Sequence, residues 1–154
     1  DEGLVDIGNF LAEQRLPGSY VRTIERVHVP LAAAIHRKCL VDRTFVVGIC
    51  GAQGSGKSTM ALALQALLQD RGIATAVLSL DDLYLTRAER QSLAARVHPL
   101  FATRGVPGTH DVELGLRTIR ALRHAQRVAV PVFDKASDDR LPESEWREVD
   151  GPVG

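Results

Sequence analysis

The chain has 154 residues, the size of one ordinary domain, and its 45% hydrophobic and 25% charged residues are typical of a soluble globular protein rather than a disordered one. Lysine plus arginine and aspartate plus glutamate both number 19, so the formal net charge is zero and a broad electrostatic grip on nucleic acid is not expected. No apolar run approaches the length of a membrane span, and the start Asp1-Glu2 does not resemble a secretion signal. With only Cys39 and Cys50, a disulfide or zinc protein is not expected, and a reducing cytoplasm fits best.

Residues 1–42 predict a helical extension, which we separate from a main body over residues 43–154. A first helix ends where Pro17-Gly18-Ser19 interrupts its apolar face, which is formed by Leu4, Ile7 and Leu11. Ser19 is expected to cap a second helix, and Pro30 to begin a third. Their apolar residues are Tyr20, Ile24 and Val27 for the second helix and Leu31 and Ile35 for the third.

Residues 44–50, Thr-Phe-Val-Val-Gly-Ile-Cys, predict a buried parallel strand, in which Cys50 packs as a small hydrophobic residue. Residues 57–71 predict a helix, and Gly72 stands where the C-terminal cap of that helix belongs. The apolar face of this helix contains Met60, Leu64, Leu67 and Leu68.

The turn between this strand and this helix matches G-x-x-x-x-G-K-[ST], the P-loop, without a mismatch. Its glycines let backbone N–H groups converge on a polyphosphate, Lys57 adds a positive charge for the β- and γ-phosphates, and Ser58 is placed to ligate Mg²⁺. A flexible glycine/serine turn is the alternative, which the flanking strand and helix disfavour. The predicted nucleotide site is Gly51-Ala52-Gln53-Gly54-Ser55-Gly56-Lys57-Ser58-Thr59.

The elements that follow along the chain alternate between strands and helices, as in α/β proteins. Residues 74–80 predict a second buried strand, Thr86 begins a charged helix over residues 87–97, and residues 98–110 form a loop. Asp111 is expected to cap a helix whose apolar residues are Val112, Leu116, Ile119 and Leu122. Residues 127–133 predict a strand that Pro131 restricts to an edge or hairpin, with a turn over residues 134–143 and a return strand over residues 146–149.

Asp81 and Asp82 directly follow the second strand, and the carboxyl ends of strands carry the ligands in open α/β sheets. A carboxylate at this place can accept the proton of an acceptor hydroxyl or help to hold Mg²⁺, but from spacing alone a turn or cap role is at least as common. The loop residues Arg104, His110, Lys135 and Arg140 can bind an anion or remain solvated surface. His28, His36, His98 and His124 show no metal-ligand spacing and receive no role.

Four segments in this order resemble the D-glycerate 3-kinase family, over roughly residues 44–152: residues 51–58, 79–86 (Ser-Leu-Asp-Asp-Leu-Tyr-Leu-Thr), 104–111 (Arg-Gly-Val-Pro-Gly-Thr-His-Asp) and 131–135 (Pro-Val-Phe-Asp-Lys). That family is related to uridine kinase, phosphoribulokinase and pantothenate kinase. The resemblance implies an α/β fold of P-loop NTPase type, with a three-layer parallel sheet and flanking helices, and ATP and Mg²⁺ as cofactors. It implies Lys57 and Asp81 as catalytic residues, Asp81 acting as base or orienter. The implied acceptor-site residues are Asp82, Tyr84, Arg104, His110, Phe133, Lys135 and Arg140.

Two departures from that family stand out. Leu83 replaces a more usual Phe, which is conservative. Members of the family also continue past a stretch like Glu148-Val149-Asp150-Gly151-Pro152 into a strand bearing Phe-Glu-Gly and an arginine-containing lid. That strand would lie between residues 44–50 and 74–80, so we expect the N-terminal part of a longer enzyme, with a sheet that is incomplete at the C-terminus.

The leading functional hypothesis is an ATP- and Mg²⁺-dependent kinase that phosphorylates a hydroxyl of a small anionic metabolite, D-glycerate first among them. A nucleoside, pantothenate or a sugar phosphate is the alternative acceptor, and a non-catalytic ATP-binding module is the alternative of a different class. A switch or motor ATPase lacks support, because the sequence contains neither an [NT]KxD motif nor a four-residue apolar run that ends in Asp and would serve as a Walker B segment. Neither nucleic acid nor membrane is an expected partner, and the oligomeric state is not indicated.

Overall fold

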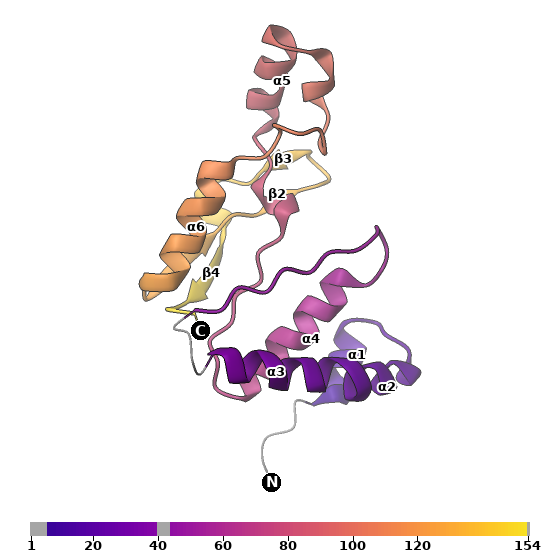
Figure 1. The fold of residues 1–154 in the computed structure, drawn as a ribbon. Helices are drawn as coiled ribbons and strands as arrows, with labels where there is room; N and C mark the ends of the chain where they lie inside the picture. The colour runs from indigo at the N-terminus through magenta and orange to yellow at the C-terminus, as the bar shows by residue number, and fades with distance from the viewer. Residues whose placement is uncertain (1–5, 40–43, 154) are drawn as a thin grey trace. The chain divides into compact units, whose positions relative to one another are not determined.

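The computed structural model describes residues 6–39 and 44–153 (Figure 1). It divides into two compact units, one of residues 1–77 with 153–154 and one of residues 78–152, and each unit is described here by itself. Leu4, which is predicted on the apolar face of the first helix, lies outside the described residues, and so does the predicted boundary between residues 42 and 43. In the part of the chain that the structure describes, no helix is long and apolar enough to cross a membrane.

The N-terminal helices differ from the prediction in how they are joined. Helix α1 (Ile7–Glu13) is capped by Asp6, whose carboxylate accepts the Asn9 N–H at 3.0 Å. The predicted break between a second and a third helix is wrong, because one continuous helical run extends from Gly18 to Cys39. Ser19 is not a cap but lies inside the first turn of this run. The run consists of η1 (Gly18–Tyr20), α2 (Val21–Thr23), the π-helical η2 (Ile24–His28) and α3 (Val29–Cys39).

The π turn η2 explains why Pro30 does not begin a separate helix. Proline lacks an N–H and its ring collides with the carbonyl four residues earlier in a regular α-helix. Directly before Pro30, the Val29 N–H donates to the Ile24 carbonyl, an i→i+5 bond that widens the turn. The wider turn makes room for the ring, so the helix continues through Pro30.

His28 lies in this π turn and is buried, with 1% of its surface exposed, and its Nδ1 has no hydrogen-bond partner among the described residues. Burial lowers the pKa of His28 below its ordinary value, so the folded protein keeps the ring neutral where the unfolded chain already binds a proton. The stabilising effect of the neutral ring is therefore complete above about pH 6.5 and is lost as the pH falls towards the folded-state pKa.

We expect the melting temperature to fall as the pH is lowered from about 7.5 to 5.5, and the variant His28→Gln to show a shallower dependence. Thermal unfolding followed by circular dichroism at both pH values measures this. Replacement of the exposed His124 by Gln is the matched control. Equal slopes for wild type and His28→Gln would contradict the prediction.

Helix α4 (Lys57–Asp70) is confirmed, with a cap at Gly72 as predicted. Gly72 has φ +75°, its N–H donates to the Gln69 carbonyl at 2.9 Å, and the Ile73 N–H donates to the Leu68 carbonyl at 3.0 Å. These two bonds form a Schellman motif, which ends the helix. The core of this unit lies between α3 and α4 and consists of Ala32, Ile35, Leu64, Leu67 and Leu68.

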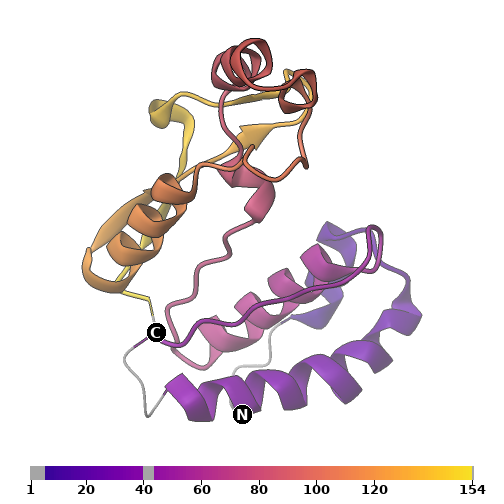
Figure 2. The ribbon, with the colours of Figure 1, turned by 45° about the horizontal axis from the view of Figure 1, so that its top comes forward.

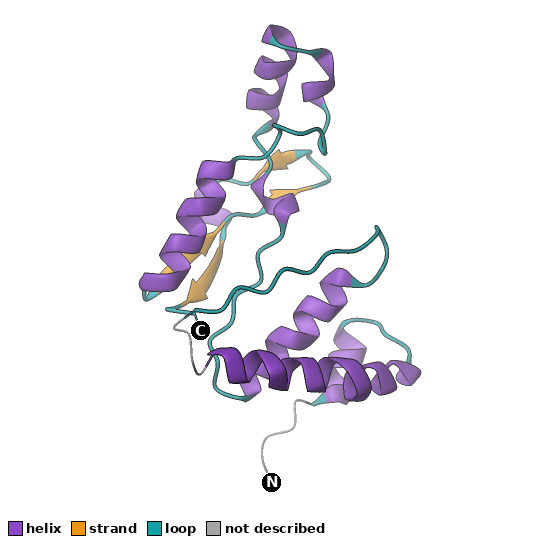
Figure 3. Ribbon diagram, viewed as in Figure 1, coloured by secondary structure: helices purple, strands orange, loops and turns teal. Residues whose placement is uncertain are grey.

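The two predicted strands of the first half are not strands in the structure: residues 45–50 and 73–79 are drawn as loops (Figure 3). The prediction that they are buried is wrong for Val46, which is 64% exposed, and for Cys50, which is exposed and does not pack as a core residue. A strand exists only through a hydrogen-bonded ladder with a neighbour. Among the described residues, neither of these two segments belongs to such a ladder.

The second unit contains the described strands, all in antiparallel pairs. β1 (Arg127–Val130) pairs with β4 (Arg147–Asp150), and β2 (Phe133–Asp134) pairs with β3 (Asp139–Arg140). The predicted return strand is confirmed by the pairing of β1 with β4. The prediction of one strand over residues 127–133 is wrong, because the β1 ladder ends before Pro131, and the predicted turn over residues 134–143 contains β3. The helical elements are η3 (Leu80–Leu83), α5 (Arg87–Arg96), η4 (Pro99–Ala102), α6 (Val112–His124) and η5 (Glu143–Glu145).

Helices α5 and α6 begin at the predicted caps. Thr86 and Glu89 form a capping box, and Asp111 accepts the Leu114 N–H at 2.9 Å. Helix α6 lies along β1 and β4 (Figure 2). The predicted apolar face is wrong for Val112 and Leu116, which are 65% and 41% exposed, and is confirmed for Leu122, which is buried. The inward residues of α6 are Leu114, Gly115, Thr118 and Leu122.

At Gly115, a Cβ atom would meet the Leu83 Cδ1 at 2.9 Å. A Cβ atom at this position would require the Leu83 side chain to shift, so Gly115 suits the close approach of η3 to α6.

Candidate active site

The P-loop begins the site. Gly54 and Gly56 have φ of +73° and +85°, in the left-handed region that residues with a Cβ rarely adopt. At Gly51 the constraint is space, since a Cβ there would lie 2.8 Å from the Ser55 Oγ. The Met60 N–H donates to the Gly56 carbonyl, so the left-handed Gly56 turns the loop directly into α4. The loop therefore ends at the positive end of a helix dipole.

Lys57 reaches back over the loop that precedes it. Its Nζ donates to the Gly51 carbonyl at 2.9 Å and to the Ala52 carbonyl at 2.7 Å. A hollow of about 130 Å³ adjoins this ammonium. It is lined by Ile49, Cys50, Ser55, Gly56, Lys57 and Met60.

The residues fit a polyphosphate, because the loop is exposed, carries no acidic side chain and combines glycine backbone with one cation at a helix N-terminus. In the first unit, the exposed Ser58 hydroxyl would be the protein ligand of Mg²⁺. Among the described residues no group of three or more His, Cys, Asp or Glu side chains could hold a metal ion. A magnesium ion would therefore depend on phosphate oxygens and water besides Ser58.

Asp81 and Asp82, in the second unit, have different partners. The cap of η3 is Ser79, whose Oγ accepts the Asp81 N–H at 3.2 Å. Asp82 Oδ1 accepts the Phe133 N–H at 3.1 Å, which ties η3 to the start of β2. Asp81 Oδ2 lies 2.7 Å from the Lys135 Nζ. Asp82 thus has a backbone partner on the β2–β3 hairpin, and the Asp81 carboxylate has an exposed ammonium as its partner.

Three predicted acceptor-site residues form an aromatic cluster next to these acids. The Tyr84 and His110 rings stack at 4.2 Å, and the Tyr84 and Phe133 rings meet edge to face at 5.5 Å. The backbone of Tyr84 pairs with that of His110, flanked by the Leu85 N–H to Thr109 carbonyl bond at 2.9 Å. The structure thus brings Tyr84, His110 and Phe133 together within one unit, and their role at an acceptor site stays a prediction.

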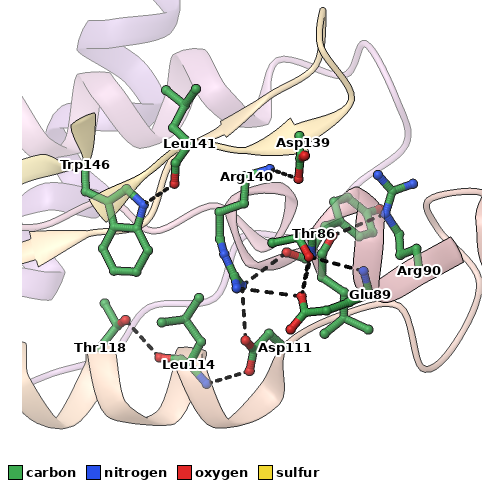
Figure 4. A network of polar contacts seen from close by, with 12 residues as sticks. Thr86, Glu89, Arg90, Asp111, Leu114, Thr118, Asp139, Arg140, Leu141 and Trp146 are labelled. Atoms are coloured by element: carbon green, nitrogen blue, oxygen red, sulfur yellow. Dashed lines mark hydrogen bonds and ion pairs between the residues drawn. The ribbon is translucent and has the colours of Figure 1, made fainter. Parts of the chain in front are cut away.

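Arg140 joins the N-termini of two helices (Figure 4). Its Nη1 lies 3.1 Å from the Asp111 Oδ2 and donates to the Tyr84 carbonyl at 3.4 Å, and its Nη2 lies 3.8 Å from the Glu89 Oε2. Asp111 caps α6 and Glu89 belongs to the capping box of α5. The guanidinium is therefore already paired with two carboxylates, and it holds the β2–β3 hairpin against both caps.

Arg90 is a residue of this region that the sequence analysis missed. It is 1% exposed and donates to the Leu85 carbonyl at 3.2 Å, the Ala102 carbonyl at 2.9 Å and the Asp138 carbonyl at 2.6 Å. Its Nη2 also lies 3.1 Å from the Asp138 Oδ2. The sequence does carry one sign of this burial. Leu93 and Ala94 follow Arg90 by three and four residues, which places all three on the inward face of α5.

The predicted residue Arg104 shares this partner. Its Nε lies 2.7 Å from the Asp138 Oδ1, and its guanidinium carbon lies 5.3 Å from the centre of the Phe133 ring. Arg90 lies over the same ring at 5.8 Å. Two arginines and one carboxylate therefore fix the tip of the hairpin, where Asp138 has φ +56°.

We expect Arg90→Met to lower the free energy of unfolding by about 3 kcal/mol, because it strands three carbonyls and leaves the Asp138 carboxylate with Arg104 alone. Urea denaturation measures this. The control is Arg87→Met, an exposed position on the same helix, where less than about 0.5 kcal/mol is expected. Equal effects at the two positions would contradict the role given to Arg90.

The chain is similar in sequence to known kinases. The chain is 40% identical over 115 residues to an uncharacterized kinase of Schizosaccharomyces pombe, covering 70% of this chain and 42% of that protein. It is 35% identical over 119 residues to the chloroplastic D-glycerate 3-kinase of Arabidopsis thaliana, covering 70% of this chain and 26% of that protein. The chain thus spans less than half the length of these two curated relatives.

Among solved structures, D-glycerate 3-kinase from Cryptococcus neoformans matches with a TM-score of 0.62 and 30% identity, covering 89% of this chain and 50% of the other. This neighbour confirms the expected P-loop kinase fold, whose α/β class the mixed helices and strands also show. Residues 46–152 match the sequence profile of the Phosphoribulokinase / Uridine kinase family. The chain belongs to this family of P-loop kinases.

Proposed function

We propose that this chain carries the nucleotide loop and the acceptor site of an ATP-dependent kinase that phosphorylates a hydroxyl of D-glycerate. The observation that carries the kinase assignment is the P-loop, with left-handed Gly54 and Gly56 and the Lys57 ammonium at the start of α4. The relatives named D-glycerate 3-kinase support this acceptor. The division into a helical extension over residues 1–42 and a kinase core over residues 43–154 is part of the same proposal.

In the proposed reaction, residues 51–59 hold the triphosphate of ATP, with Lys57 on its β- and γ-phosphates and Ser58 as a ligand of Mg²⁺. The oxygen of the acceptor hydroxyl forms a bond to the γ-phosphorus, and the bond from that phosphorus to the β,γ-bridging oxygen breaks. ADP leaves with the electron pair of the broken bond. The proton of the hydroxyl passes to the Asp81 carboxylate, which no backbone group occupies among the described residues.

The acceptor site is proposed from the second unit alone. Tyr84, His110 and Phe133 form its wall, and Asp82 keeps the hairpin next to η3. Lys135 is the cation nearest to Asp81 and is 65% exposed, so a carboxylate can reach it from solvent. Arg104 and Arg140 contribute indirectly, because they already bind Asp138 and Asp111 and so hold the hairpin in place. The exposed Lys135 ammonium suits the single carboxylate of glycerate.

Another acceptor, such as a nucleoside, pantothenate or a sugar phosphate, is the alternative within the same family. A coupled assay of ADP release from the full-length protein, with this panel of acceptors, separates the candidates. D-glycerate is expected to give the highest kcat/KM. No ADP release that depends on glycerate would reject this substrate, and release with another acceptor would identify the alternative.

A further inference from the structure

The hairpin that carries Lys135 is fixed at its first residue. The Phe133 N–H is bound to the Asp82 carboxylate at 3.1 Å, and Lys135 follows two residues later. The intervening Asp134 is occupied within the turn, since its carboxylate accepts the Ala136 and Ser137 N–H groups, both at 3.0 Å. Hydrogen bonds from the Ser137 hydroxyl and from these two amides hold the pKa of Asp134 below its ordinary value. The nearest acid on the hairpin is thus committed to the turn.

The other cations around the site are less exposed than Lys135. Arg90 and Arg104 share Asp138, and Arg140 is bound by Asp111 and Glu89. Within the described residues the Lys135 ammonium has one polar partner, the Asp81 Oδ2 at 2.7 Å. Both side chains are open to solvent, Lys135 at 65% and Asp81 at 47% exposure. The most exposed cation of these four is therefore paired with the carboxylate that the proposed reaction uses as base.

We propose that the Lys135–Asp81 ion pair is a latch on the acceptor site, which the carboxylate of an anionic acceptor opens by taking Lys135 as its own counter-ion. This inference rests on the proposed function. Opening frees the Asp81 Oδ2 to receive the hydroxyl proton, so the base becomes available when an acceptor with a negative charge is bound. A neutral polyol such as glycerol leaves the pair closed.

The energetics allow such an exchange. An exposed ion pair contributes little to stability, because water screens both charges and two long side chains must be ordered. A second carboxylate can therefore replace Asp81 without a large penalty. Selectivity arises because the Lys135 ammonium cannot neutralise the Asp81 carboxylate and the acceptor carboxylate at full strength together. When the acceptor carboxylate takes Lys135, the Asp81 carboxylate is released and acts as the base.

Binding of D-glycerate tests the latch directly. If Asp81 competes with glycerate for Lys135, Asp81→Asn is expected to lower the Kd of glycerate by about two- to fivefold. Loss of a nearby negative charge would also favour an anion without any latch, so a double-mutant cycle is required. With a latch, the gain from Asp81→Asn disappears in the Lys135→Met background. With simple charge repulsion, the gain remains.

The chain has three lysines, Lys38, Lys57 and Lys135, so reductive ¹³C-methylation gives three lysine signals in the NMR spectrum. The signal that is missing in Lys135→Met is assigned to Lys135, and Lys38→Met is the matched control at an exposed position. We expect the Lys135 signal to move with Asp81→Asn, and to move saturably with D-glycerate but not with glycerol.

The outcomes separate this inference from the proposed function. Glycerate-dependent ADP release together with a tightening by Asp81→Asn that persists in Lys135→Met would overturn the latch and leave the kinase proposal in place. A Lys135 signal that ignores glycerate while the acceptor still turns over would do the same. Absence of both glycerate binding and glycerate turnover would overturn both proposals.

Discussion

Replacement of Lys57 by alanine is expected to lower kcat/KM for ATP by about 10²–10³-fold, the loss usual for one preorganised donor on a developing charge. In the structure the ammonium is held by the Gly51 and Ala52 carbonyls, and in the proposed reaction it binds the β- and γ-phosphates instead. Calorimetry with Mg²⁺ and ATP on the full-length protein, beside an assay of ADP release, measures the effect.

Two controls make the Lys57 result readable. Lys38→Ala removes an exposed lysine of α3 and is expected to change neither binding nor turnover. Thermal unfolding without nucleotide shows whether Lys57→Ala loosens the loop itself, because its two carbonyl bonds are lost as well. A variant that stays folded and binds ATP like the wild type would remove the basis of the phosphate site.

Local features of the fold were predictable from the sequence because they depend on a few consecutive residues. The caps at Thr86 and Asp111 and the Schellman motif at Gly72 follow from the hydrogen bonds that one side chain or one left-handed residue can make with its own helix end. The P-loop belongs to the same class, since Gly54 and Gly56 are required by their φ angles alone.

Whether residues 44–50 and 74–80 form strands could not be predicted from such local features. Their composition favours a strand, but a strand also needs a partner elsewhere in the chain, and here neither segment belongs to a paired strand. Cys50 is exposed for the same reason. In contrast, the residues of β1 find their partner in β4 only 17 residues after Val130 (147 − 130), and this prediction is confirmed.

The candidate site shows the same limit. In the sequence, Arg104, Lys135 and Arg140 are equivalent loop cations, because each stands in a polar loop. Their difference lies in contacts across the unit, Arg104 with Asp138 and Arg140 with Asp111, which no spacing in the sequence reveals. Arg90 was missed for the complementary reason, since an arginine in a charged helix is usually assigned to the surface.

Asp81→Asn is expected to lower kcat by about 10²–10⁴-fold while the affinity for ATP is kept, because the amide retains the shape of the side chain and cannot accept the hydroxyl proton. Stopped acceptor turnover with unchanged ATP binding distinguishes a phosphotransferase from a module that only binds nucleotide, for which the substitution would have no functional effect. The ADP assay and calorimetry together measure both quantities.

The neighbouring acid supplies the control for this experiment. Asp82→Asn keeps Oδ1 as an acceptor for the Phe133 N–H, so it should preserve the hairpin and most of the turnover. A base role assigned to the wrong aspartate would reverse the two results. If instead both variants keep full turnover, the proton must be accepted elsewhere, and neither carboxylate that follows Leu80 takes part in the chemistry. The pair of substitutions therefore tests the position of the base and its existence separately.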